Sequence, residues 1–146
     1  MATFEQHVTI DASIEQVWAL MINPQSWGQW FPDADQITGL ESITQGATFQ
    51  WQEGTESGTA SITEVDTDRG LIKVVTTKDS QQTTHTFDLD KAGGFFGIGA
   101  NDTKLLYKRE YHAQGGIIGE FVAGGNPMDA RDVKQTIEKI KRLAQG

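Results

Sequence analysis

The chain has 146 residues, enough for one domain with a substantial core, and we expect a single domain over residues 1–146. Its apolar fraction of 37% excludes a disordered chain, and no apolar run is long enough for stable membrane insertion. The absence of cysteine excludes disulfides, thiolate metal sites and cysteine nucleophiles.

The net charge of −8 is concentrated in the first half of the chain. Residues 1–68 hold eleven acidic residues and no Lys or Arg, whereas residues 69–146 hold twelve basic and nine acidic residues. An acidic surface repels phosphate backbones, so we expect no nucleic-acid partner. The first residues lack the basic and apolar regions of a secretory signal, which predicts a cytoplasmic protein.

A strand that leads directly into a helix opens the chain. Apolar and polar residues alternate over residues 4–10, which predicts a half-buried strand. Ser13 and Gln16 have the spacing of a capping box, and apolar residues follow at helical intervals. Pro24 ends this helix and favours a second short helix.

Period-two alternation dominates residues 35–112. Glycine and aspartate clusters interrupt the alternation every eight to twelve residues or so, which is typical of an antiparallel meander. The strands expected here cover residues 47–53, 59–66, 71–77, 83–89 and 105–111.

One long amphipathic helix closes the chain. Asn126 is a good N-cap and Pro127 suits the first helical position. From residue 130 to residue 144, apolar residues recur at steps of three and four, with charges on the opposite face. The apolar face predicts that this helix lies across one face of the sheet.

These residues carry a family resemblance that covers essentially the whole chain. Residues 10–20 (IDASIEQVWAL), Trp27, residues 30–32 (WFP) and residues 136–143 (TIEKIKRL) resemble the SRPBCC superfamily. This is the START-like, helix-grip group that includes polyketide cyclase and dehydrase-like proteins. The resemblance implies an α+β fold, in which a seven-stranded antiparallel sheet curls around a long C-terminal helix and two short helices follow strand one. It also implies an apolar cavity between sheet and helix.

A glycine-rich stretch over residues 93–99 departs from the usual pattern of the group. It is longer and more apolar than a plain hairpin and contains Phe95 and Phe96. These two rings either tuck under the sheet edge as additional core or cap the mouth of a cavity. Residues 115–125 form a second glycine-flanked apolar segment, and we expect the two segments to form the entrance.

Two charged residues fall on strand faces that also carry aromatic residues. Glu53 shares a face with Phe49 and Trp51, and Arg109 shares a face with Tyr107. A buried unpaired ion is costly, so we predict that Glu53 and Arg109 pair across the interior as a polar anchor. The alternative is a strand bulge that turns one of them toward solvent.

His85 is the one histidine expected to face inward, because it shares the face of Phe87. His7 and His112 fall on outer faces, and no histidine stands in a metal-binding spacing, so neither a metal nor a cofactor is expected. His85 is therefore the only plausible general acid or base, and a structural or ligand-orienting role is the alternative.

The aromatic residues have two interpretations, as ordinary core or as the wall of a ligand cavity, and in this fold the same residues often serve as both. The candidate ligand-binding residues are Trp27, Trp30, Phe49, Trp51, Glu53, His85, Phe87, Tyr107, Arg109 and Phe121.

Three functional hypotheses follow. The first is binding of a small hydrophobic molecule, lipid or polyketide-like, with one polar end, in an internal cavity between sheet and C-terminal helix. The second is a cyclase, dehydratase or hydrolase that acts on a polyketide-like substrate through His85 with Glu53 or Tyr107. The third is an interaction module resembling chaperone activators, with the acidic first half as its docking surface.

Overall fold

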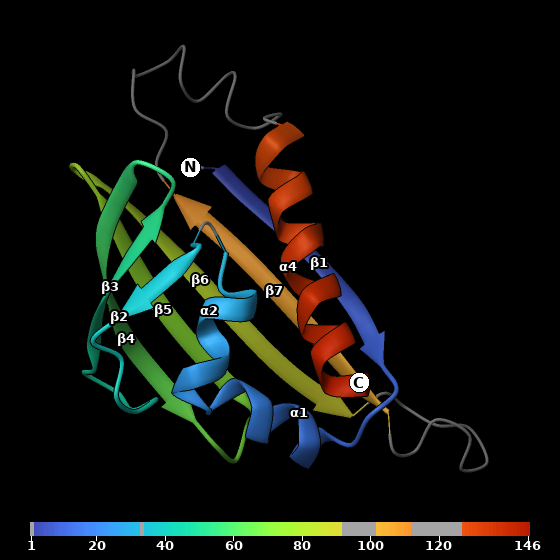
Figure 1. Cartoon of the computed structure of the whole chain (residues 1–146). Helices are drawn as coiled ribbons and strands as arrows, with labels where there is room; N and C mark the ends of the chain where they lie inside the picture. The colour runs from blue at the N-terminus through green and yellow to red at the C-terminus, as the bar shows by residue number, and fades with distance from the viewer. Residues whose placement is uncertain (1, 33, 92–101, 112–126) are drawn as a thin grey trace.

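A computed structural model describes residues 2–32, 34–91, 102–111 and 127–146. The predicted loop over residues 93–99, the segment 115–125, Phe121, His112 and Asn126 therefore lie outside the described residues. The chain forms one curved sheet with a long helix across one face and short helices at one end (Figure 1).

The elements follow one another in the predicted order of strand, helices, strands and helix. They are β1 (Ala2–Ile10), α1 (Ile14–Met21), the 3₁₀ helix η1 (Pro24–Ser26), α2 (Trp27–Trp30), β2 (Gln36–Thr38), β3 (Thr48–Glu53), β4 (Glu56–Asp66), β5 (Leu71–Lys78), β6 (Gln81–Lys91), β7 (Thr103–Tyr111) and α4 (Pro127–Gln145).

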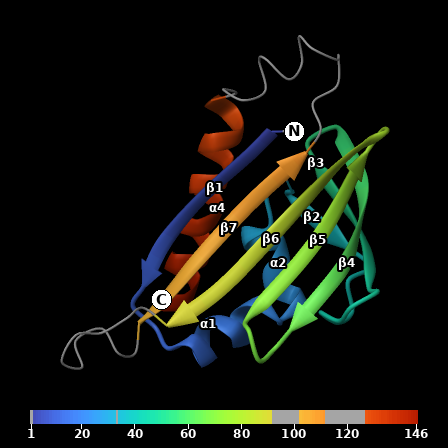
Figure 2. The same cartoon turned by 180° about the vertical axis from the view of Figure 1, so that it is seen from behind.

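The seven strands make a single antiparallel sheet. Their order is β1-β7-β6-β5-β4-β3-β2, so the first strand pairs with the last and the remaining strands follow as a meander. The helix α4 packs on β1 and β7, at one edge of the inner face of the sheet (Figure 1). In the reverse view, no helix of the described residues covers the outer face (Figure 2). This is the helix-grip α+β architecture that the resemblance implied.

Local sequence signals explain where the helices begin. The Ser13 side chain accepts a hydrogen bond from the Gln16 backbone, and the Gln16 side chain accepts one from the Ser13 backbone, so the predicted capping box is confirmed. Pro127 is the first residue of α4, as predicted. Asn23 caps η1 through its side chain, which accepts a hydrogen bond from the Gln25 backbone.

The core beneath the sheet is an aromatic cluster centred on the short helix α2. Trp27 has no exposed surface, and its ring centre lies 5.0 Å from that of Trp30, 5.1 Å from that of Phe31 and 5.6 Å from that of Phe49. The Trp27 indole donates a hydrogen bond to the Met21 carbonyl, which satisfies its one polar atom. The buried residues of α4, Val133, Ile137 and Ile140, complete this core.

A glycine lets the last large ring of the cluster approach the sheet. Gly58 on β4 lies opposite Trp51 on β3, and a methyl group at Gly58 would overlap with the Trp51 indole and the Thr77 carbonyl. The indole nitrogen of Trp51 donates to the Thr59 carbonyl at 3.2 Å. A side chain at position 58 would therefore push the ring away from β4.

Candidate functional site

A chain of polar contacts crosses the inner face of the sheet from β5 to α4. The Thr76 hydroxyl lies 2.9 Å from His85 Nε2, and His85 Nδ1 lies 2.6 Å from the Tyr107 hydroxyl. Arg109 Nε donates to that same hydroxyl at 3.2 Å, and Arg109 Nη1 lies 3.8 Å from a carboxylate oxygen of Asp132. We call these five residues the interior polar network.

Strand register brings the network together. His85 on β6 pairs with Val74 of β5 on one side and with Arg109 of β7 on the other, so the side chains share one face. Tyr107 lies two residues before Arg109 and occupies the same face of β7. Asp132 is supplied by the second turn of α4, which lies over this part of the sheet.

The surroundings of the network are apolar and aromatic. Tyr107 stacks on Phe87 with ring centres 4.6 Å apart, and Phe31 lies 5.5 Å from the His85 ring. His85 is 1% exposed and Arg109 is 2% exposed, so both polar side chains are withdrawn from water. Their polar atoms must therefore be satisfied inside the protein or by something that enters it.

Burial decides the charge state of His85. Desolvation lowers the pKa of its imidazole well below the ordinary value, and the positive charge of Arg109 lowers it further. The ring is therefore neutral near pH 7, with one nitrogen donating and the other accepting. Its two recorded neighbours, Thr76 and Tyr107, are hydroxyls that suit either role.

The Tyr107 hydroxyl is the chemical centre of this arrangement. Its oxygen accepts from Arg109 Nε, because a guanidinium only donates. When its proton points to His85 Nδ1, the Nε2 proton of the imidazole is directed to Thr76, and all three contacts are satisfied. Such a chain can hold an oxygen atom of a ligand and can move a proton between Tyr107 and His85.

Most of the predicted site residues lie in this interior. Tyr107, His85, Phe87 and Arg109 face inward, which confirms the alternation on β6 and β7. The aromatic candidates of α2 and β3 are also buried, namely Trp27, Trp30, Phe49 and Trp51.

Glu53 is the exception, because the prediction that it is buried and pairs with Arg109 is wrong. It is exposed at the last position of β3, where the chain turns at Gly54 with a positive φ of 59°. Three strands separate β3 from β7, and among the described residues Asp132 of α4 is an acidic side chain that approaches Arg109. The cause is the end of the strand and not the bulge considered as the alternative.

Sequence reasoning did not identify Thr76 and Asp132 as members of the network. Thr76 could have been found, since it lies two residues after Val74 on a predicted strand and therefore shares its face. Asp132 carried no such signal, because it belongs to the charged side of the closing helix and is one-third exposed. Its role depends on how α4 sits on β7, which the sequence pattern does not give.

Metal ligands are not clustered in the described part of the chain, where no group of three His, Cys, Asp or Glu side chains could hold an ion. Among the helices that the structure describes, none has the length and hydropathy to cross a membrane.

A protein-family comparison matches residues 1–145 to the family described as polyketide cyclase / dehydrase and lipid transport. The chain belongs to this family. The SRPBCC resemblance found in the sequence is thereby confirmed. The comparison with curated proteins finds no significant match.

Three solved structures illustrate the shared fold. The aromatase/cyclase Zhui from Streptomyces sp. R1128 has 16% identity and a TM-score of 0.70, with 97% of this chain and 92% of that chain covered. Norcoclaurine synthase from Thalictrum flavum, in complex with dopamine and hydroxybenzaldehyde, has 13% identity and a TM-score of 0.71, with 97% and 84% covered. DynU16, a putative protein in the dynemicin biosynthetic locus, has 14% identity and a TM-score of 0.69, with 98% of this chain covered. This chain spans 47% of DynU16, about half its length.

Proposed function

We propose that this protein binds a small, largely apolar organic molecule with one oxygen-bearing polar end, between the inner face of the sheet and α4. Aromatic side chains would bury the apolar part, at about 25 cal/mol per Å² of apolar surface. Arg109 and Tyr107 would hold the polar end.

The observation that carries the proposal is the burial of Arg109 within aromatic surroundings. Removing a guanidinium from water costs on the order of several kcal/mol, which partners inside the protein or on a ligand must offset. A guanidinium in such surroundings suits a ligand carboxylate, phosphate or carbonyl.

The comparisons support the same class of ligand. The family description joins polyketide chemistry with lipid transport, and both concern molecules with a large apolar part. The norcoclaurine synthase structure contains dopamine and hydroxybenzaldehyde, which are aromatic rings with polar groups. The identity of the ligand of this chain and a cytoplasmic location stay predictions.

Native mass spectrometry of the freshly purified protein, followed by organic extraction, is the first test of this proposal. A discrete added mass is expected, and the extract gives the ligand's chemical class. If the mass is that of the protein without a ligand, the next step is titration with 1-anilinonaphthalene-8-sulfonate, a fluorescent apolar probe with one anionic group. The proposal would be contradicted if no added mass is found and the probe also shows no saturable binding.

Variants separate the anchor from ordinary packing. Arg109→Met is expected to weaken probe binding by about tenfold or more, because a charge-assisted hydrogen bond is lost. Lys104→Met is the matched control, since it removes the same charge from the exposed side of β7. Tyr107→Phe keeps the stacked ring and removes only the hydroxyl, so it tests the anchor even if Arg109→Met folds poorly. If all three variants bind the probe with the affinity of the wild type, Arg109 and Tyr107 do not hold its polar end.

A second candidate function is acid–base catalysis on the bound molecule, as in cyclisation or dehydration. The 2.6 Å contact between His85 Nδ1 and the Tyr107 hydroxyl favours it, because a neutral imidazole beside a phenol can relay a proton. When the extracted ligand is supplied, His85→Gln is expected to retain binding and lose turnover. Unchanged turnover in this variant would leave binding as the function. The interaction-module hypothesis stays a prediction.

A further inference from the structure

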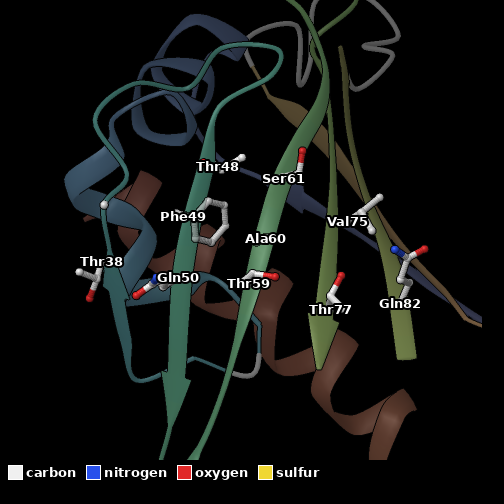
Figure 3. Close-up of a pocket in the computed structure, with 11 residues that line it drawn as sticks. Thr38, Thr48, Phe49, Gln50, Thr59, Ala60, Ser61, Val75, Thr77 and Gln82 are labelled. Atoms are coloured by element: carbon white, nitrogen blue, oxygen red, sulfur yellow. The ribbon is translucent and has the colours of Figure 1, made fainter. Parts of the chain in front are cut away.

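A groove of about 690 Å³ lies on the outer face of the sheet, away from α4 (Figure 3). It crosses β3, β4 and β5 and reaches β2 and β6. Its lining residues are Thr38, Gly39, Thr48, Phe49, Gln50, Thr59, Ala60, Ser61, Val75, Thr77 and Gln82.

Strand register arranges the polar part of this lining as a row. Thr38 pairs with Gln50, Gln50 with Thr59, Thr59 with Thr77, and Thr77 with Gln82. One continuous line of five hydroxyl and amide side chains therefore runs across five strands. Side chains that share a face at neighbouring positions are close enough to contact one ligand together.

A second row, adjacent to the first, lies at the upper edge of the groove in Figure 3. Thr48 pairs with Ser61, and Ser61 pairs with Val75. The pairing of β4 with β5 shifts just beyond Ser61, between Ile62 and Glu64. Bulges bend a strand and are common beside binding sites, and this irregularity lies next to the groove.

The polar side chains of the outer groove have no recorded intramolecular hydrogen bond in the described chain, unlike several other threonines. Thr76 bonds to His85, Thr103 to the Ala12 carbonyl and Thr136 to the Asp132 carbonyl. The seven groove side chains with hydroxyl or amide groups keep their donors and acceptors available to a ligand.

The outer groove also lacks charge, although the protein carries a net charge of −8. All eleven lining residues are uncharged. A phosphate or carboxylate would find no cation there, and a purely apolar molecule would leave the hydroxyl and amide groups without partners. The lining instead matches a neutral molecule that offers many donors and acceptors, and the volume is that of a typical small-molecule site.

We infer that the outer groove binds an uncharged, hydroxyl-rich small molecule, a saccharide of one or two rings. The site is separate from the interior polar network, because the two lie on opposite faces of the sheet. Adjacent residues of β5 show the separation, since Thr76 bonds to His85 while Thr77 lines the groove. The inference therefore stands or falls independently of the proposed interior ligand.

The test is a nitrogen-15 amide NMR titration of the full chain with glucose, maltose and cellobiose. Dissociation constants of about 1 mM are expected for such a shallow site, with shifts concentrated in β3, β4, β5 and β6. The double variant Thr59→Val with Thr77→Val keeps branched side chains on both strands and removes two hydroxyls. It is expected to weaken binding by about tenfold.

Two control variants locate the site. Thr3→Val with Thr9→Val removes two exposed hydroxyls from β1, at the opposite edge of the sheet, and is expected to bind normally. Tyr107→Phe alters only the interior and is also expected to bind normally.

Three kinds of result would overturn the inference. One is the absence of localised shifts with all three saccharides up to about 50 mM, well above the expected constant. Another is normal binding by the Thr59 and Thr77 double variant, or lost binding in Tyr107→Phe. The third is tighter binding of glucuronate than of glucose, because a carboxylate would then be preferred over a neutral ring.

Discussion

Threonine side chains have opposite surroundings on the two faces of the sheet. On the inner face, Thr76 forms a hydrogen bond with His85, and Tyr107 forms hydrogen bonds with His85 and Arg109. On the outer face, the threonines and glutamines of the outer groove have no recorded intramolecular partner in the described chain. Inner polar groups thus contribute to stability, whereas outer ones are available for binding.

The difference follows from the cost of burial. A polar group that folding removes from water must regain its hydrogen bonds within the protein, and its loss leaves a neighbour unsatisfied. A polar group at the surface of a groove keeps its hydrogen bonds to water, so its substitution costs little free energy of unfolding. Substitutions on the inner face should therefore change the free energy of unfolding, and substitutions on the outer face should change only ligand affinity.

The largest expected effect comes from Gly58, where the two faces meet through the backbone of β4. Gly58→Ala places a methyl group against the Trp51 indole and the Thr77 carbonyl, so the ring or the strand must move. We expect a loss of about 3 kcal/mol in the free energy of unfolding, the upper end for overpacking, as measured by urea denaturation.

Gly28→Ala is the matched control, because a methyl group there meets nothing and Gly28 lies in α2. It is expected to be neutral or stabilising by about 0.5–1 kcal/mol through helix propensity. Equal losses in the two variants would show that Trp51 does not depend on the close approach at Gly58.

The second prediction concerns the pH dependence of stability. The pKa of His85 is lowered in the folded protein by burial and by Arg109, while the unfolded value is about 6.5. As pH falls through 6.5 or so, the unfolded chain takes up the proton first, and stability falls by up to about 1.4 kcal/mol per pH unit. Above that pH the contribution is fully present. Urea denaturation between about pH 5 and pH 8 measures the slope.

His85→Gln should reduce this slope, because the titrating group is removed from the interior. His7→Gln is the matched control, since it makes the same substitution at an exposed position on the outer face of β1. A slope that is the same in wild type and in His85→Gln would contradict a buried neutral imidazole.

Much of the inner face could be predicted from the sequence. The alternation along β6 and β7 placed His85 and Arg109 inward, because strand periodicity holds while a strand continues without a bulge. The same rule did not predict the exposure of Glu53, because the alternation of faces does not tell where along a strand the core ends. Asp132 was missed for a related reason, since its contact with Arg109 depends on the docking of α4.

The outer groove could not be predicted at all. Its row depends on register, which places Thr59 opposite both Gln50 and Thr77, and a shift of one residue would scatter these side chains over both faces. The irregularity between Ile62 and Glu64 lies next to the groove, and alternation gives no signal for it. Individual polar residues on an outer face are ordinary, and only their three-dimensional alignment distinguishes them.

The smallest expected effect compares two neighbouring residues of β5, and it is the most direct test of the difference between the faces. Thr76→Val removes the hydroxyl that contacts His85 Nε2 and leaves a buried nitrogen without that partner. We expect a loss of about 1 kcal/mol in the free energy of unfolding. Thr77→Val makes the same chemical change one position later, on the groove side, and should alter stability by less than about 0.5 kcal/mol.

Strand propensity, side-chain volume and position along β5 are nearly identical in these two variants, so they cancel in the difference between them. The remaining difference is the contribution to the free energy of unfolding of a hydroxyl that contacts His85, relative to that of a hydroxyl that faces the outer groove. The reverse order is expected for saccharide affinity, which Thr77→Val should weaken and Thr76→Val should not. Equal stability of the two variants would mean that the contact of Thr76 with His85 contributes nothing to folding, and the division between the faces would then fail where they are closest in sequence.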